Sequence, residues 1–260
     1  MRLAWLTDLH LNFVNHRTRQ ALYTSIKEAN PEATLVTGDW AEADSLLALL
    51  TEWQTELNIP TYFVLGNHDF YHGNFATTRN QLTTLPPNLQ YLTTSSVIYL
   101  DKSTALIGHA SWADARCGNF FLSPIRLNDH VLIADLCNLP PKLLFKKLNE
   151  LGDQAASTLE QKLNQALTNH QHVILATHVP PYREACWHQG RISDDDWLPH
   201  FASKAVGEKL TPIMQQHPDQ TLTIYCGHTH SSGTAHILPN LTVHTGQATY
   251  GQPAIQQILE

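Results

Sequence analysis

The chain has 260 residues, of which 42% are hydrophobic, and a formal net charge of −7 at pH 7. This length and apolar content suffice for one large domain with a buried core. The negative charge argues against binding to a nucleic-acid polymer or an anionic membrane, since both select a basic protein surface.

The location of the protein is also constrained by the sequence. No apolar segment approaches the roughly 20 residues needed to span a bilayer, and the first predicted strand leaves no room for a signal peptide. The four cysteines have neither metal-type nor disulfide-type spacing. We therefore expect a cytoplasmic protein that does not associate with membranes.

Five apolar runs each end in polar residues that can bind metal ions. These runs are residues 3–7 before Asp8 and His10, 33–37 before Asp39, 61–65 before Asn67, His68 and Asp69, 172–177 before His178, and 222–226 before His228 and His230. Such short runs predict buried strands, and open α/β sheets bind ligands at the carboxyl ends of their strands. Five strands that deliver Asp, Asn or His to one edge predict a site for more than one metal ion.

The segments between these strands predict an α/β chain. Helices are expected at 14–29, 41–57, 152–169 and 205–216, and further strands at 97–100, 104–108, 234–238, 242–245 and 255–259. Residues 111–150 and 182–203 are less regular, and we interpret them as inserts that flank the site. Because the polar clusters extend from residue 8 to residue 230 and must converge, residues 1–260 are expected to form a single domain.

The number and type of the polar residues indicate two metals. Residues two apart on an extended chain point to the same side, so Asp8 and His10 are expected to bind together. A mixture of carboxylate, amide and imidazole ligands suits Mn, Fe or Zn better than Ca. Seven ligands are too many for one tetrahedral zinc. Pairs of metals about 3.5–4 Å apart are typical of phosphatases and nucleases, where they activate a bridging water and clamp the attacking and leaving oxygens.

Together, the motifs Asp8-x-His10, Gly38-Asp39, Gly66-Asn67-His68-Asp69, His178 and Gly227-His228-x-His230 resemble the five sequence blocks of the calcineurin-like metallophosphoesterase superfamily, in the same order. The resemblance implies a four-layer α/β/β/α sandwich of two mixed sheets flanked by helices, with the metal site at the carboxyl edge of the strands. It also implies the role of each residue. Asp8, His10 and His230 would bind one metal, Asn67, His178 and His228 the second, Asp39 would bridge both, and His68 would be a catalytic residue that binds no metal.

Several residues outside these motifs have open roles. Asp69 either orients His68 or caps the segment after it. His109 ends another apolar run and is either a substrate contact or a structural histidine. Arginine is a bidentate partner for phosphate, so an arginine in or beside the inserts is expected to contact the substrate. The candidates are Arg116, Arg126, Arg183 and Arg191.

The leading hypothesis is a phosphohydrolase that depends on two divalent or transition metal ions and acts on a small phosphoester. In the reaction that the resemblance implies, a metal-bridging hydroxide attacks phosphorus in line while His68 assists the leaving oxygen. A phosphodiesterase and a broad-specificity phosphatase both fit. A non-catalytic metal-binding interaction module on the same fold is the alternative, but such a chain is expected to lose His68 or several ligands, and all are present.

Overall fold

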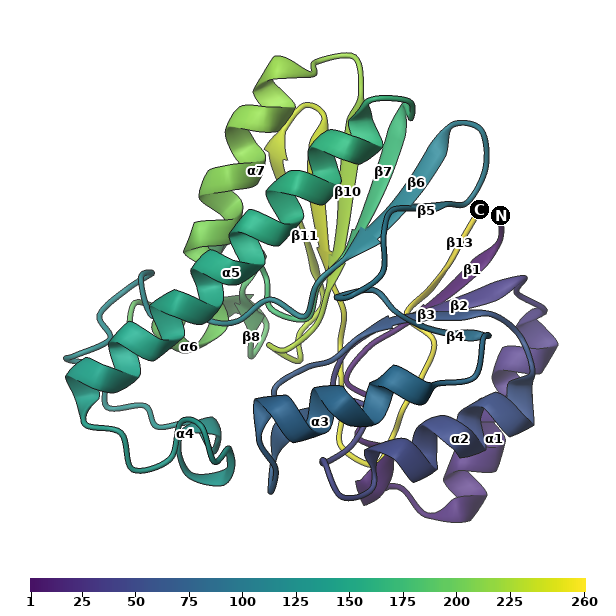
Figure 1. The fold of residues 1–260 in the computed structure, drawn as a ribbon, viewed down its shortest axis with the longest axis horizontal. Coiled ribbons are helices and arrows are strands. Elements are labelled where there is room, and N and C mark those ends of the chain that lie inside the picture. The colour runs from purple at the N-terminus through teal and green to yellow at the C-terminus, as the bar shows by residue number, and fades with distance from the viewer.

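The computed structural model describes residues 1–260 as two mixed sheets that pack face to face (Figure 1). The first sheet has the strand order β13-β1-β2-β3-β4, in which β1 to β4 are parallel and β13 is antiparallel to β1. Its strands are β1 (Leu3–Leu6), β2 (Ala33–Thr37), β3 (Thr61–Val64), β4 (Leu89–Tyr91) and β13 (Gln257–Leu259).

The second sheet has the order β11-β12-β10-β7-β6-β5. Its four central strands are parallel, and the edge strands β5 and β11 are antiparallel to their neighbours. Its strands are β5 (Ile98–Tyr99), β6 (Thr104–Gly108), β7 (His172–Ala176), β10 (Thr221–Cys226), β11 (Gly233–Leu238) and β12 (Leu241–Thr245), and a separate two-stranded ribbon pairs β8 (Trp187–His188) with β9 (Arg191–Ile192).

Helices cover the outer face of each sheet (Figure 1). The longer helices are α1 (His16–Ala29), α2 (Leu46–Leu57) and α3 (Phe75–Gln81) on the side of the first sheet, and α5 (Pro141–Leu167) and α7 (Lys204–Gln216) on the side of the second; α4 (Asp129–Leu132) and α6 (Leu198–Phe201) are single turns. One apolar cluster joins the first sheet to its helices and another joins the second sheet to α5 and α7. A third, which includes Trp5 and Tyr225, lies between the sheets. These layers confirm the predicted sandwich.

The predicted strands that carry the polar clusters are confirmed, whereas the inserts differ from the prediction. Helix α5 begins at Pro141, eleven residues before the predicted start at Gly152. Proline is favoured in the first turn of a helix, where its missing N–H is not needed, so the Pro140-Pro141 pair begins a helix here. The first insert is therefore shorter than expected and contains α4, and the second contains the β8–β9 ribbon and α6.

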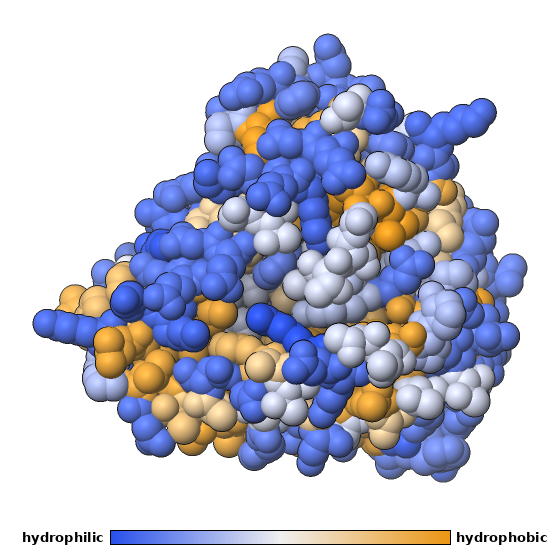
Figure 2. All heavy atoms as spheres, viewed as in Figure 1, coloured by the Kyte–Doolittle hydropathy of each residue, from blue (hydrophilic) through white to orange (hydrophobic).

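The face shown in Figure 2 is mostly polar, and its broadest apolar area lies over the region of α4 and the start of α5. The exposed apolar side chains of this region are Phe121, Leu122, Val131 and Leu143. None of the helices combines the length and the apolar character that crossing a membrane requires.

Candidate metal centre

The seven proposed ligands meet where the carboxyl ends of the two sheets lie together. Asp8, Asp39 and Asn67 follow β1, β2 and β3 of the first sheet. His178 follows β7 of the second sheet, and His228 and His230 follow β10. All are buried except His230, whose side chain is 25% exposed at the mouth of the site.

One group of four ligands is compact enough to hold a metal ion. The ligand atoms of Asp8, His10, Asp39 and His230 all lie within 4.8 Å of one another. His230 Nε2 is 3.3 Å from Asp8 Oδ1 and 3.3 Å from His10 Nε2. His10 Nε2 is 3.7 Å from Asp39 Oδ2. Carboxylates and imidazoles at these distances could hold a metal ion, and we call this group the first metal site.

The second group forms around Asn67, whose Oδ1 lies 3.0 Å from His178 Nε2 and 3.0 Å from His228 Nδ1. The other carboxylate oxygen of Asp39, Oδ1, is 3.4 Å from His178 Nε2. Asp39 therefore faces both groups, one oxygen toward each, as a bridging ligand must.

Hydrogen bonding shows that the second group is built for a cation. His178 Nδ1 lies 2.9 Å from Thr37 O, and His228 Nε2 lies 2.8 Å from His200 O. A carbonyl only accepts, so each neutral ring carries its hydrogen on that nitrogen and turns a lone pair toward Asn67 Oδ1. Three acceptor atoms then face one another with no hydrogen between them, and a bound metal ion removes this conflict.

Two further contacts fix the orientation of Asn67. Its Nδ2 donates to Asp129 Oδ1 at 2.8 Å and to the hydroxyl of Tyr71 at 3.2 Å, and that hydroxyl donates to Asp129 Oδ1 at 2.7 Å. With the amide nitrogen committed to these partners, the amide oxygen points into the site. Asp129 belongs to the first insert and His200 to the second, so each insert orients one ligand.

The electrostatics of the site also favour bound cations. Burial lowers the pKa of His10 to about 2, that of His228 to about 4, and that of His178, so these rings are neutral ligands near pH 7. Burial, together with the charge of Asp8, raises the pKa of Asp39 well above its usual range. An ionised Asp39 therefore needs positive charge beside it.

His230 titrates differently from the other histidines. Burial alone would lower its pKa, but the hydrogen bond and charge of Asp8 outweigh burial and raise it. For Asp8, burial alone would raise the pKa. The hydrogen bond with His230 outweighs burial, so the pKa of Asp8 lies below its usual range. Each of the two side chains therefore favours the charged form of the other.

The backbone of the site is not extended, contrary to the expectation for Asp8 and His10. Five of the seven ligands have left-handed backbone angles: Asp8 (φ 49°), His10 (φ 43°), Asp39 (φ 53°), His228 (φ 71°) and His230 (φ 61°). Non-glycine residues rarely adopt this conformation, which accumulates at functional sites. Strands β1, β2 and β10 therefore end in sharp turns that aim ligands inward. Alternation along a strand does not explain why Asp8 and His10 converge.

Two glycines make close approach possible. A Cβ atom on Gly66 would overlap Asp39 Oδ1, and a Cβ atom on Gly227 would overlap Asp8 Oδ2. These two glycines, which precede the proposed ligands Asn67 and His228, are thus required by the lack of space for a side chain.

His68 lies beside the two ligand groups without belonging to either. Its backbone N–H donates to Asp39 Oδ1 at 2.9 Å, and its ring packs 4.2 Å from the ring of Tyr71 and 4.6 Å from that of His10. Its Nδ1 is buried without a hydrogen-bond partner. Burial lowers the pKa of His68 to about 4. The structure thus places a neutral imidazole at the edge of the metal centre.

Asp69 accepts hydrogen bonds from backbone that precedes it in the sequence, and not from the segment after it as one of its two proposed roles required. It is fully buried, and its carboxylate accepts from Ala41 N at 3.0 Å and from Gly66 N at 2.7 Å. These bonds join the loop after β2 to the loop after β3. Asp69 therefore caps the turns that present Asp39 and Asn67.

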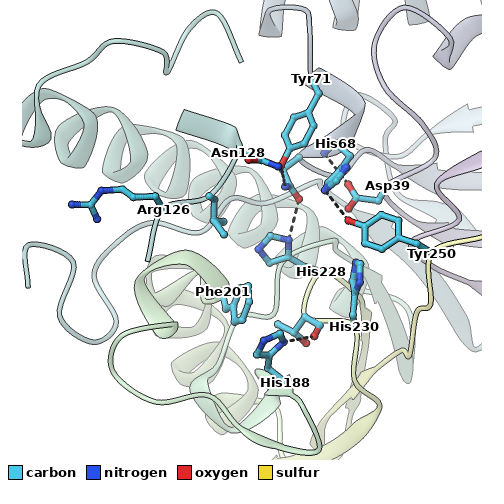
Figure 3. A pocket seen from close by; sticks show the side chains of 13 residues that line it. Asp39, His68, Tyr71, Arg126, Asn128, His188, Phe201, His228, His230 and Tyr250 are labelled. Atoms are coloured by element: carbon cyan, nitrogen blue, oxygen red, sulfur yellow. Dashed lines mark hydrogen bonds between the residues drawn. The ribbon is translucent and has the colours of Figure 1, made fainter. Parts of the chain in front are cut away.

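A cavity of about 280 Å³ opens above the metal centre (Figure 3). The residues around it come from both sheets, both inserts and the C-terminal segment. They are Asp39, Asn67, His68, Tyr71, Arg126, Leu127, Asn128, His188, Phe201, His228, Thr229, His230 and Tyr250. Arg126 is the only arginine among them.

The other proposed substrate contacts lie outside this lining. Arg116 pairs with Asp153 through two hydrogen bonds of 2.7 and 2.8 Å, and Arg183 pairs with Asp195 at 2.7 Å. Arg191 is exposed on β9. His109 Nδ1 accepts from Ser111 N at 2.9 Å, as a structural histidine would. Arg126 is therefore the one proposed substrate contact that lines the cavity, with its guanidinium directed away from the proposed metal ligands (Figure 3).

Tyr250 was not anticipated from the sequence. It lies in the segment between β12 and β13, where no metal-binding motif or apolar run marks it. Its ring packs 4.4 Å from that of His10 and 5.3 Å from that of His230. A tyrosine close to a chain end becomes a site residue here because β13 returns to pair with β1.

A two-sheet sandwich with a paired Asp, Asn and His cluster between the strand ends defines the class of binuclear metallohydrolases. The sequence matches the calcineurin-like phosphoesterase family over residues 1–232. The chain belongs to this family, and it is a hydrolase of the metal-dependent phosphoesterase type.

Solved structures share the fold at low sequence identity. The phosphopantetheinyl hydrolase of Mycobacterium tuberculosis has a TM-score of 0.69 at 14% identity, covering 96% of this chain and 90% of its own. A dimetal phosphatase from Danio rerio has a TM-score of 0.61 at 12% identity, with coverage of 96% and 88%. A protein from Thermus thermophilus has a TM-score of 0.53 at 11% identity, with coverage of 95% and 88%. No curated protein has a sequence that matches this chain significantly.

Proposed function

We propose that the chain is a phosphodiesterase that depends on two metal ions. The observation that supports the diester is the shape of the site, which extends to both sides of His68. A second cavity, of about 350 Å³, adjoins the first. The two cavities share four lining residues, namely His68, Tyr71, Asn128 and Tyr250.

A phosphodiester carries two organic substituents, whereas a monoester carries one. With the phosphorus at the metal centre, one substituent would lie in the cavity toward Arg126 and Phe201. The other would lie toward Phe13 and Leu132 in the second cavity. The structural neighbour from Mycobacterium tuberculosis is a phosphopantetheinyl hydrolase, which agrees with a substrate that has a large organic group beside its phosphate.

In the proposed reaction each group of residues has a defined task. Asp8, His10 and His230 would hold one metal, Asn67, His178 and His228 the other, and Asp39 would bridge them. The bound metals, for which Mn, Fe and Zn are all suitable, would activate the attacking water and neutralise charge on the phosphate. His68 would donate a hydrogen bond or proton to the leaving oxygen as negative charge develops there.

The decisive experiment compares two chromogenic substrates, p-nitrophenyl phosphate and bis-(p-nitrophenyl) phosphate. Metal-stripped protein is assayed with and without added Mn²⁺, and an Asp39→Ala variant serves as the control for contaminating activity. The proposal expects Mn²⁺-dependent cleavage with the diester hydrolysed faster. Faster cleavage of the monoester would instead favour a broad-specificity phosphatase. Lack of cleavage of both, with two metals bound, would contradict the proposal.

A further inference from the structure

Tyr250 occupies a special position among the residues around the metal centre. It lies on the connection from β12 of the second sheet to β13 of the first, beyond residues 1–232 that match the family. Its ring covers His10 and His230, two ligands of the first metal site, and packs against Phe13 at 5.8 Å. The residue is 50% exposed and lines both cavities.

The hydroxyl of Tyr250 lies close to the imidazole ring of His68. Its oxygen lies 3.4 Å from His68 Nε2, as the dashed line in Figure 3 shows. Hydrogen bonds from hydroxyl groups are usually about 2.7–2.8 Å long, so this contact leaves both groups with unused bonding capacity. Two polar atoms at this distance can both bind one further atom that lies to the side of the line joining them, in the cavity that both residues line.

The other phenol of the site is not available in this way. The hydroxyl of Tyr71 donates to Asp129 Oδ1 at 2.7 Å, and this bond orients Asn67. Tyr250 is thus the phenol free to donate into the cavity. A phenol carries its hydrogen at neutral pH and can therefore act as a donor there.

We infer that Tyr250 is a further substrate-contacting residue, whose hydroxyl donates a hydrogen bond to the phosphate oxygen that lies next to His68. This inference rests on the proposed function only in requiring a phosphate group at the metal centre. Tyr250 and His68 then contact the same phosphate side by side, at the boundary between the two substituent cavities. The ring of Tyr250 has a separate task, which is to shield His10 from water.

The test separates the hydroxyl from the ring by means of Tyr250→Phe. Binding of orthophosphate to Mn²⁺-loaded protein is measured by calorimetry, together with metal content. Tyr99→Phe is the matched control. Tyr99 lies on β5 of the second sheet, is also exposed, at 57%, and stacks its ring on that of His170, outside the lining of both cavities. We expect Tyr250→Phe to weaken phosphate binding roughly 10-fold or more, as for a lost hydrogen bond to a charged group. Both metals should stay bound, and Tyr99→Phe should bind like the unmodified protein.

Each outcome decides the inference independently of turnover. Unchanged phosphate affinity in Tyr250→Phe, loss of metal from that variant, or failure of the unmodified protein to bind phosphate would overturn it. A weakened phosphate affinity would support it even if the unmodified protein hydrolysed no diester, and in that case the proposed phosphodiesterase function alone would be rejected. In an active protein, the effects of Tyr250→Phe and His68→Ala should be less than additive, because both groups serve one phosphate.

Discussion

Asp129 and Asn67 are joined by a hydrogen bond of 2.8 Å that spans 62 residues of sequence, from the first insert to the loop after β3. Because this bond turns the amide oxygen of Asn67 toward the second metal site, Asp129→Ala should weaken binding of that metal. Outer partners of metal ligands typically contribute about 10- to 100-fold in affinity. Titration of metal-stripped protein with Mn²⁺ should show one site weakened and one unchanged.

Asp153→Asn is the control for this prediction, since Asp153 is an exposed partner of Arg116 outside the metal centre. It should bind both metals like the unmodified protein. Equal binding of both metals by Asp129→Ala would show that Asn67 does not need this orientation.

Asp39→Ala should remove metal and activity together. Asp39 faces both ligand groups, at 3.7 Å from His10 Nε2 and 3.4 Å from His178 Nε2, so its loss affects both sites. Metal content measured by plasma emission should fall below one ion per chain after dialysis. A variant that retained two ions would disprove the bridging role.

His68→Ala should reduce activity without loss of metal, unlike Asp39→Ala. His68 is not among the ligand atoms that converge at the site, so both metals should stay bound while turnover falls by roughly 10²- to 10⁴-fold, the usual range for acid–base catalysis. His72→Ala is a suitable control, because His72 is a half-exposed neighbour whose nearest charged partner is Glu42. Loss of metal from His68→Ala would contradict its assignment.

Acidification should empty the first metal site before the second. The raised pKa of His230 means that this ring takes up a proton at a higher pH than an ordinary histidine, and the proton competes with the metal. The pKa of His228 is lowered to about 4, and that of His178 is also lowered, so these rings stay free for metal in more acidic solution. Metal content after dialysis between pH 8 and pH 4 should therefore fall in two steps, and His230→Gln should remove the step at higher pH.

Arg126→Ala should raise KM for the diester, whereas Arg116→Ala should not. Only Arg126 lines the cavity, and it is held by no carboxylate; its Nη1 donates to the carbonyls of Ser123 and Ile125. Because the charge of Arg126 is exposed, the increase in KM should be roughly 2- to 5-fold, and it should be smaller at high salt. Steady-state kinetics at two salt concentrations tests this, and equal effects of the two substitutions would refute a special role for Arg126.

The sequence predicted that the seven proposed ligands would come together, because each one follows a buried strand and the order of strands in an α/β sheet brings strand ends together. Apolar runs define those strands clearly, and the polar residue that ends a run is easily recognised. The same reasoning failed for the backbone between Asp8 and His10, where left-handed turns replace the extended chain. Left-handed backbone is usually found at glycine. Because Asp8 and His10 are not glycines, the local sequence gives no sign of these turns.

The substrate side of the site was less predictable for a different reason. Which arginine lines the cavity depends on the carboxylates that pair with the other arginines. Asp153, for example, pairs with Arg116. Tyr250 becomes a site residue only through the pairing of β13 with β1, a contact between the two ends of the sequence. Such relationships follow from the tertiary structure and leave no pattern in a single sequence.

Each proposed metal takes ligands from both sheets: Asp8 and His10 with His230 for one, and Asn67 with His178 and His228 for the other. A cut in the exposed turn at residues 101–103, between β5 and β6, would give two fragments that each contain only part of both ligand sets. Neither fragment alone should bind two metals. Metal ions should instead drive the fragments to reassemble, so that the chain becomes a split enzyme whose complementation is controlled by metal concentration.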